Sequence, residues 1–235
     1  MHYAFEGKTL SFEGKKFDPS ARTFSQMRPV LLYPEKESSL APDAPLYYMY
    51  REVKRFSNLR YDMTRILPAN ISGEHNKTFG HIHPVSKKGA AWSEVYEVLE
   101  GKAHFILQKV STLGVQDAIL LTAEKGDCLL IPPGYGHVTI NPGRKDLLLA
   151  NLVSDDFSAD YSPYLHHHGA CYYELTDGKL VRNKSYGNGY EIRKSTAVKF
   201  SSAFGVFAPF AGKTLLEVTK DYSKIEFLEK PETFY

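Results

Sequence analysis

The sequence has little cysteine, little tryptophan and no long hydrophobic stretch: two cysteines and one tryptophan occur among its 235 residues. The spacing of Cys128 and Cys171 fits neither a zinc motif nor a disulfide framework, and the apolar neighbours of Cys128 predict a buried thiol. The longest apolar runs, near residues 118–121 and 147–150, are too short to span a bilayer. The first residues lack the basic start and apolar core of a secretory signal. These absences predict a cytoplasmic protein without a membrane partner.

An excess of one charge is also missing. Lysine and arginine total 29 and aspartate and glutamate 27, for a formal net charge of +2. Such a balance gives no reason to expect a nucleic-acid partner, because phosphate backbones are bound through excess positive charge. The hydrophobic share of 43% is ordinary for a globular protein, and the length allows a sizeable core.

Short segments rich in aromatic and β-branched residues follow one another from residue 46 to 186, and helical periodicity is poor. This pattern predicts an all-β barrel in a single domain over residues 46–186. Residues 1–45 contain five prolines and are interpreted as an N-terminal arm that wraps the barrel or reaches a second subunit. Residues 187–235 are too few to bury a core of their own, so we expect a C-terminal extension packed on the barrel.

Two stretches carry the residues typical of a metal site. His81 and His83 are two apart, and alternate residues of a β-strand point to the same face. Glu94 opens the next predicted strand, and a stretch rich in glycine and proline then delivers His137. Three imidazoles and one carboxylate suit Fe(II), Mn(II), Ni(II) or Zn(II). Four protein ligands on an octahedral ion leave two positions for adjacent substrate oxygens.

The remaining histidines are interpreted as structural. His104 lies in the middle of a predicted strand, and His75 lies in a predicted loop. The tract at residues 166–168 has a composition that can bind metal, but its place between Pro163 and Gly169 favours a surface loop.

The two stretches resemble the two cupin motifs. The first matches Gly, His-x-His and Glu-x6-Gly from Gly80 to Gly101, and the second matches Gly-x5-Pro-x-Gly-x2-His-x3-Asn from Gly126 to Asn141. The resemblance implies a cupin double-stranded β-helix, a jelly-roll barrel. The gap between His83 and Glu94 is longer than the usual cupin spacing, which predicts a loop insertion at the barrel mouth.

Within the cupins, the chain resembles the cupin-type glucose-6-phosphate isomerases known best from archaea. The likeness runs from about residue 46 to 186 and is carried by Leu46-Tyr-Tyr-Met-Tyr50, Thr64, Thr78-x-Gly80-His-x-His83, Glu94-Val-Tyr96, Pro132-Pro133 with His137, Asp160-Tyr161, and Gly178 with Asn183. The family pattern is not matched at three further pocket positions, where this chain has Gly134, Val153 and Ala159.

The resemblance implies an enzyme that interconverts glucose 6-phosphate and fructose 6-phosphate, with Fe(II) as the first choice of metal, and a homodimer. It implies His81, His83, Glu94 and His137 as metal ligands, and Glu94 as the group that moves a proton through an enediol. A hydride shift between C2 and C1 stays open as the competing route. Tyr96, also assigned to the reaction, either positions substrate or packs beside the ligand strand.

The same resemblance implies a phosphate site near Thr64, Thr78 and Gly80, with Tyr47 as a pocket tyrosine. Hydroxyl groups and a glycine N–H approach phosphate oxygens without a Cβ in the way. Two other readings of the sequence stay open. One is a different cupin enzyme, an Fe(II) dioxygenase or an epimerase, and the other is a cupin that binds a sugar phosphate without turnover.

Overall fold

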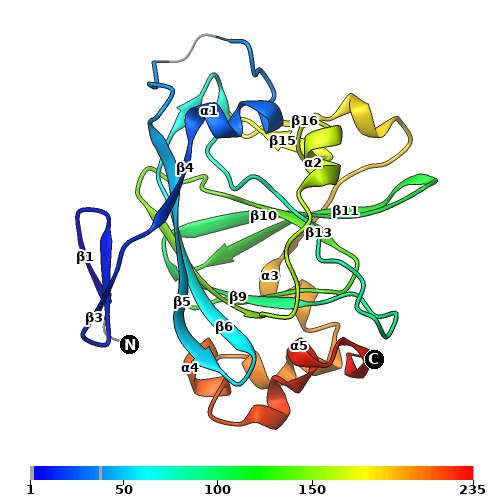
Figure 1. Ribbon diagram of the computed structural model, residues 1–235. Coiled ribbons are helices and arrows are strands. Elements are labelled where there is room, and N and C mark those ends of the chain that lie inside the picture. Colours follow the sequence, from blue (N-terminus) through cyan, green and yellow to red (C-terminus); the bar gives the residue numbers. More distant parts are fainter. Residues whose placement is uncertain (1–2, 37–38, 235) are drawn as a thin grey trace.

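The computed structural model describes residues 3–36 and 39–234, and its centre is a barrel made of two facing β-sheets (Figure 1). The larger sheet has the order β12 (Cys128–Ile131), β9 (Glu94–Glu100), β14 (Leu147–Ser154), β6 (Leu59–Ile66), β5 (Pro45–Phe56) and β4 (Ser20–Thr23). The smaller sheet has the order β13 (Gly136–Ile140), β10 (Lys102–Ser111), β11 (Gly114–Glu124) and β17 (Arg193–Thr196). All pairs are antiparallel except β11 with β17.

Alternate residues of the larger sheet face two different environments. On β14, Leu148, Ala150 and Leu152 belong to the core on the outer face of the sheet, whereas Asn151 and Val153 line a pocket inside the barrel. Every residue of β14 is buried. A strand that is buried on both sides needs other residues packed against both faces of its sheet. Segments outside the barrel therefore have to cover the outer face of the larger sheet.

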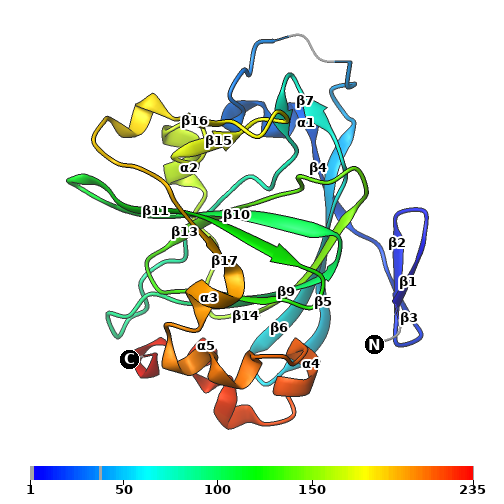
Figure 2. The same cartoon turned by 180° about the vertical axis from the view of Figure 1, so that it is seen from behind.

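The two ends of the chain supply that cover (Figures 1 and 2). A small sheet of β1 (Tyr3–Glu6), β2 (Thr9–Phe12) and β3 (Lys15–Phe17) packs beside β5 through Leu10 and Phe12. Residues 197–234 form a chain of short helices below the barrel. The buried apolar side chains from Phe207 onward join the same outer core, whereas Ala197 and Phe200 pack in the core inside the barrel. These helices are α3 (Ala197–Ser201), η3 (Gly205–Phe210), α4 (Leu215–Val218), η4 (Tyr222–Lys224), α5 (Glu226–Glu229) and η5 (Pro231–Thr233).

The opposite end of the barrel is closed by short elements. They are α1 (Phe24–Met27), η1 (Arg28–Val30), β7 (Asn70–Ile71), β8 (Glu74–His75), α2 (Ser162–His166), η2 (Lys184–Tyr186), and the hairpin of β15 (Tyr172–Glu174) and β16 (Leu180–Arg182). A buried ion pair between Glu74 and Lys77 lies here, and the other carboxylate oxygen of Glu74 accepts a hydrogen bond from the backbone N–H of Leu32 at 3.0 Å. This contact ties the N-terminal segment to the barrel.

The expected all-β cupin barrel with extensions at both ends is confirmed. Both extensions also contribute to the barrel sheets, since β4 pairs with β5 and β17 pairs with β11. Residues 1, 2, 37 and 38 of the expected arm and residue 235 of the expected extension lie outside the described residues. Among the described residues, no helix is long and apolar enough to cross a membrane.

Candidate metal centre

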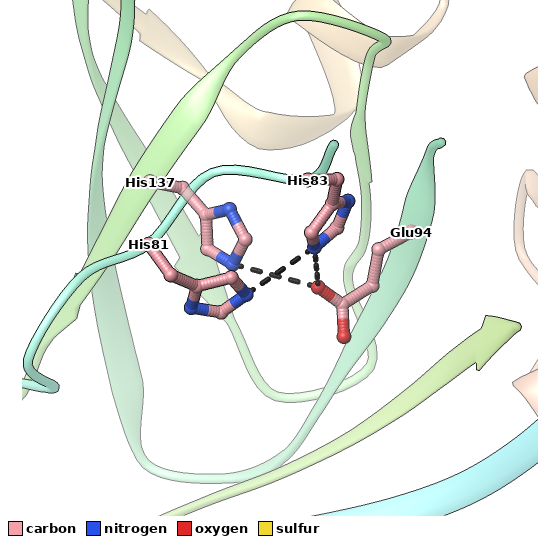
Figure 3. Close-up of side chains that lie close together, drawn as sticks. All are labelled: His81, His83, Glu94 and His137. Atoms are coloured by element: carbon pink, nitrogen blue, oxygen red, sulfur yellow. Dashed lines mark hydrogen bonds and ion pairs between the residues drawn. The ribbon is translucent and has the colours of Figure 1, made fainter. Parts of the chain in front are cut away.

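The sequence predicts a strand for the stretch that carries His81 and His83. In the structure, this stretch instead pairs with its neighbours only at isolated single residues. His81 pairs with His137 of β13, and the next residue, Ile82, pairs with Asp160. The backbone N–H of His81 donates to the carbonyl of His137 at 3.2 Å, and the reverse bond is 3.0 Å long. Because the backbone stays extended, His81 and His83 still point to the same side (Figure 3).

The four predicted ligands converge on one point (Figure 3). The Nε2 atoms of His81 and His83 lie 3.2 Å apart. Oε2 of Glu94 lies 3.3 Å from Nε2 of His83 and 3.5 Å from Nε2 of His137. Ligand atoms held at about 2.1 Å from one metal ion lie about 3 Å apart in adjacent positions. Among the described residues, these four form the only group of three or more His, Cys, Asp or Glu close enough to share an ion.

Glu94 presents one oxygen to the imidazoles and the other to an amide. Oε1 accepts a 2.6 Å hydrogen bond from Nδ2 of Asn151 on β14. Oε2 is buried and has no hydrogen-bond partner despite its short distances to the imidazoles. A buried carboxylate oxygen without a partner is costly. A cation held between Oε2 and the three Nε2 atoms would remove that cost, so the residues present fit a divalent metal.

The protonation states favour metal binding as well. Burial, followed by the imidazoles of His137 and His83, holds the pKa of His81 well below its usual value. Burial and His83 have the same effect on the pKa of His137. Both rings are therefore neutral at pH 7 and offer lone pairs. Burial and the Glu94 carboxylate raise the pKa of Tyr96, so its phenol stays protonated and is able to donate a hydrogen bond.

Tyr96 both packs and contacts the cluster. Its ring lies against Phe105, with centroids 5.7 Å apart, and its hydroxyl oxygen lies 3.2 Å from Nε2 of His137. Tyr96 therefore packs beside the ligand strand with its hydroxyl at the cluster, and its role in positioning substrate stays a prediction.

A cavity of about 330 Å³ opens beside the cluster. Its lining includes the three residues predicted to hold the phosphate, Thr64, Thr78 and Gly80, and the predicted pocket tyrosine, Tyr47. The hydroxyl of Thr78 accepts the backbone N–H of Thr139 at 3.0 Å, and that of Tyr47 accepts the N–H of Phe79 at 3.3 Å. Both O–H protons remain available as donors, because a hydroxyl has one proton besides its lone pairs.

Gly80 has a packing role that the sequence interpretation did not anticipate. Its φ is +88°, and a Cβ would lie 2.4 Å from the Tyr164 ring and 2.6 Å from Cγ2 of Val138. Both neighbours are fully buried. The fold therefore requires glycine here, whatever the phosphate needs.

Gly80→Ala is expected to destabilise the protein by about 2–5 kcal/mol, because a left-handed φ costs about 1–2 kcal/mol and an overpacked core about 1–3 kcal/mol. Urea unfolding measures the change. Gly178→Ala is the matched control, since φ is +84° there and an added Cβ would meet nothing within 4 Å. Equal losses in the two variants would contradict the packing role of Gly80.

Several pocket residues were missed from the sequence. Asn151 interrupts the apolar run Leu147–Val153. A polar residue inside such a run could have predicted a hydrogen bond to another buried polar group. Arg51 lies where the pairing of β5 with β6 shifts register, and a bulge of this kind re-aims side chains unpredictably. Its guanidinium donates to Oδ2 of Asp62 at 2.8 Å at the pocket wall. Arg22 of β4 lies near Tyr47 and partly offsets the rise that burial causes in the Tyr47 pKa.

Two of the other histidines have polar protein partners. Nδ1 of His104 lies 2.8 Å from a carboxylate oxygen of Glu174, and Nδ1 of His167 donates to the carbonyl of Ser185 at 3.0 Å. The predicted insertion after His83 forms a small hairpin closed by the pairing of Val85 with Ala91.

Comparison with known proteins gives a consistent result. A family model described as glucose-6-phosphate isomerase matches residues 21–191. The glucose-6-phosphate isomerase of Thermococcus litoralis is 29% identical over 146 residues, which cover 60% of this chain and 73% of that protein. The one from Sinorhizobium medicae is 24% identical over 161 residues, covering 67% and 69%. A solved structure of oxalate oxidase with glycolate covers 55% of this chain and 60% of that chain at 15% identity, and its TM-score of 0.40 is too low to support a conclusion.

Proposed function

The chain belongs to the glucose-6-phosphate isomerase family, and we propose that it interconverts glucose 6-phosphate and fructose 6-phosphate with the help of one divalent metal ion. The observation that carries the proposal is the buried, partnerless Oε2 of Glu94, surrounded by three imidazoles at the side of the pocket. Family membership alone implies the reaction. The cluster provides a site at which this chain could carry out that isomerisation.

We propose His81, His83, Glu94 and His137 as the metal ligands and Fe(II) as the metal, with Mn(II), Ni(II) and Zn(II) as substitutes. A bound divalent ion would act as a Lewis acid that polarises the oxygens on C1 and C2 of the sugar. Support comes from the short distances between the ligand atoms and from the low pKa values of His81 and His137.

The phosphate group is proposed to lie at Thr64, Thr78, Gly80 and Tyr47. The O–H groups of Thr78 and Tyr47 have their oxygens anchored to backbone N–H groups, and their protons can turn toward a phosphate oxygen. Arg22 lies beside Tyr47, over the rings of Phe79 and Tyr161 at 5.2 and 5.8 Å. Its positive charge would offset part of the phosphate charge. Through Arg22 the N-terminal arm would take part in substrate binding.

Glu94 is proposed to move the proton. It takes the proton from C2 of the aldose as the C1=C2 bond forms and the C1 carbonyl electrons move to O1, which gains a proton. O2 then loses its proton to water as the C2 carbonyl forms, which balances the proton that O1 takes from water, and Glu94 returns a proton to C1. The hydrogen bond from Asn151 occupies one lone pair of Oε1 and leaves a second one to receive the proton. Protonated Tyr96 is proposed to donate to a substrate oxygen and so to orient it.

Turnover of fructose 6-phosphate in D₂O distinguishes this route from a hydride shift. Proton transfer through Glu94 exchanges with solvent, so glucose 6-phosphate is expected to carry deuterium at C2, measured by proton NMR. A hydride shift moves hydrogen with its electron pair from carbon to carbon and leaves C2 without deuterium. Product without deuterium would contradict the role of Glu94 as base and leave the isomerase proposal intact.

Mannose 6-phosphate, the C2 epimer of glucose 6-phosphate, is the matched competing substrate for the reverse reaction, which forms fructose 6-phosphate. Equal use of glucose 6-phosphate and mannose 6-phosphate would show that the pocket does not discriminate at C2. Oxygen consumption with a small organic substrate, or tight binding of fructose 6-phosphate without turnover, would instead support one of the two alternative readings.

A homodimer in the cytoplasm stays part of the proposal. The outer face of the larger sheet is covered by the chain's own residues, including Phe12, Phe207 and Phe227. A dimer would therefore have to use a different surface. Light scattering coupled to size-exclusion chromatography gives the oligomeric state directly.

A further inference from the structure

His83 is the predicted ligand with the least support from the backbone. Glu94 and His137 lie in strands, and His81 pairs with His137 through two hydrogen bonds. His83 follows the last paired residue, Ile82, and precedes Pro84, which has no N–H to continue a ladder. The orientation of its ring therefore depends on side-chain surroundings.

Two neighbours define those surroundings. Nδ1 of His83 lies 3.3 Å from the backbone carbonyl of Trp92. A carbonyl oxygen only accepts, so Nδ1 carries the proton and Nε2 keeps its lone pair directed at the cluster. The ring of Phe157 covers His83 with centroids 4.8 Å apart. Both features fix the ring without occupying the metal-facing atom.

Trp92 and Phe157 also support each other. Their rings stack with centroids 5.4 Å apart and an interplanar angle of 24°. Trp92 closes the hairpin of residues 84–92, where its backbone N–H donates to the carbonyl of Pro84 at 3.3 Å. Phe157 lies in the segment after β14 and lines the cavity beside the metal cluster. The stack thus joins the inserted hairpin to the segment that follows β14.

A second contact braces the hairpin from outside. Lys88 at its tip pairs with Glu232 of the C-terminal segment, but the Lys88 side chain is 68% exposed. Exposed ion pairs contribute little, because water and salt screen them. Trp92 is only 8% exposed, so the aromatic stack is the dominant support.

We propose that Phe157 and Trp92 are positioning residues for His83 and thereby set the affinity of the metal site. The inference rests on the proposed metal-dependent isomerase and adds a function for the inserted hairpin. Groups that orient a metal-binding histidine commonly change metal affinity 10- to 100-fold when they are removed.

Trp92 is the only tryptophan in the chain, so its fluorescence reports on this corner of the pocket. Ni²⁺ titrated into metal-stripped full-length protein is expected to quench that fluorescence until one ion is bound per chain. Competition with a chelator of known affinity gives the dissociation constant. Phe157→Leu is expected to weaken Ni²⁺ binding about 10-fold or more, and Phe157→Tyr, which keeps a ring over His83, is expected to stay within about three-fold of the parent.

Phe56→Leu is the matched control, since Phe56 is another half-buried aromatic residue on the barrel and does not line the cavity. It should leave Ni²⁺ affinity unchanged. A role limited to packing would lower the thermal midpoint of the metal-free Phe157→Leu protein and leave its Ni²⁺ affinity equal to that of the parent, which would overturn the proposal. If Phe157→Leu fails to fold, Phe157→Met, whose flexible side chain also has no ring, carries the same expectation.

The outcomes separate this inference from the function it rests on. A parent protein that binds Ni²⁺ and isomerises fructose 6-phosphate, with unchanged affinity in Phe157→Leu, contradicts only the positioning role. A parent protein that binds no metal contradicts both.

Discussion

Replacing Glu94 by Gln is expected to lower kcat for fructose 6-phosphate by about 10³-fold, with the fold retained. Loss of a general base typically costs 10²–10⁴-fold, and this side chain is proposed as a metal ligand as well. An amide keeps the shape of the carboxylate but not its charge. It also places an NH₂ group either toward the amide of Asn151, now 2.6 Å from Oε1, or toward the imidazoles. Neither orientation restores the interactions of the carboxylate.

Glu97→Gln is the matched control for that variant. Glu97 lies on the same strand and is equally buried, but Oε2 accepts the N–H of Leu215 from the C-terminal helices at 2.8 Å, outside the pocket. Its loss should change stability and leave kcat within a few-fold of the parent. A coupled assay of glucose 6-phosphate formation and a metal analysis of each variant give the result. Normal turnover in Glu94→Gln would refute the proposed site.

Removal of the metal is expected to abolish turnover and to lower stability. Without the ion, the buried Oε2 of Glu94 has no hydrogen-bond partner, and the Nε2 atoms of His81 and His83 lie 3.2 Å apart. An ion at 100 times its dissociation constant would stabilise the folded state by about 2.7 kcal/mol, because it binds the assembled site and not the unfolded chain. Thermal unfolding with and without a chelator measures this effect independently of activity.

The barrel and much of the metal cluster could be predicted from the sequence, because they depend on the spacing of residues that are close along the chain. Alternation of side chains along a strand brings His81 and His83 together, and glycine and proline fix the turns around them. The hairpin of β15 and β16 has a local signal of the same kind, because Thr176-Asp177-Gly178 is a turn sequence between two short strands. In these cases the deciding residues are close in the sequence, whereas the addition of Glu94 and His137 to the histidine pair followed from the order of the motifs and the resemblance to cupins.

Specific contacts between segments that are distant in the sequence could not be predicted from it. Asn151 reaches Glu94 because β14 pairs with β9, with Asn151 opposite Tyr96, and nothing local specifies that register. The stack of Trp92 on Phe157 joins residues on either side of the barrel mouth. The coverage of the larger sheet by the C-terminal helices depends on apolar residues whose spacing resembles neither a strand nor a long helix. Such contacts follow from the assembled sheets rather than from any segment alone.

The most direct test of the account is to add Fe(II) back, without oxygen, to chelator-stripped protein while following the conversion of fructose 6-phosphate to glucose 6-phosphate. We expect activity to be absent at first, to rise in proportion to added metal, and to level off at one ion per chain. Full activity in protein shown by elemental analysis to contain no metal, or no activity with one ion bound, would contradict it.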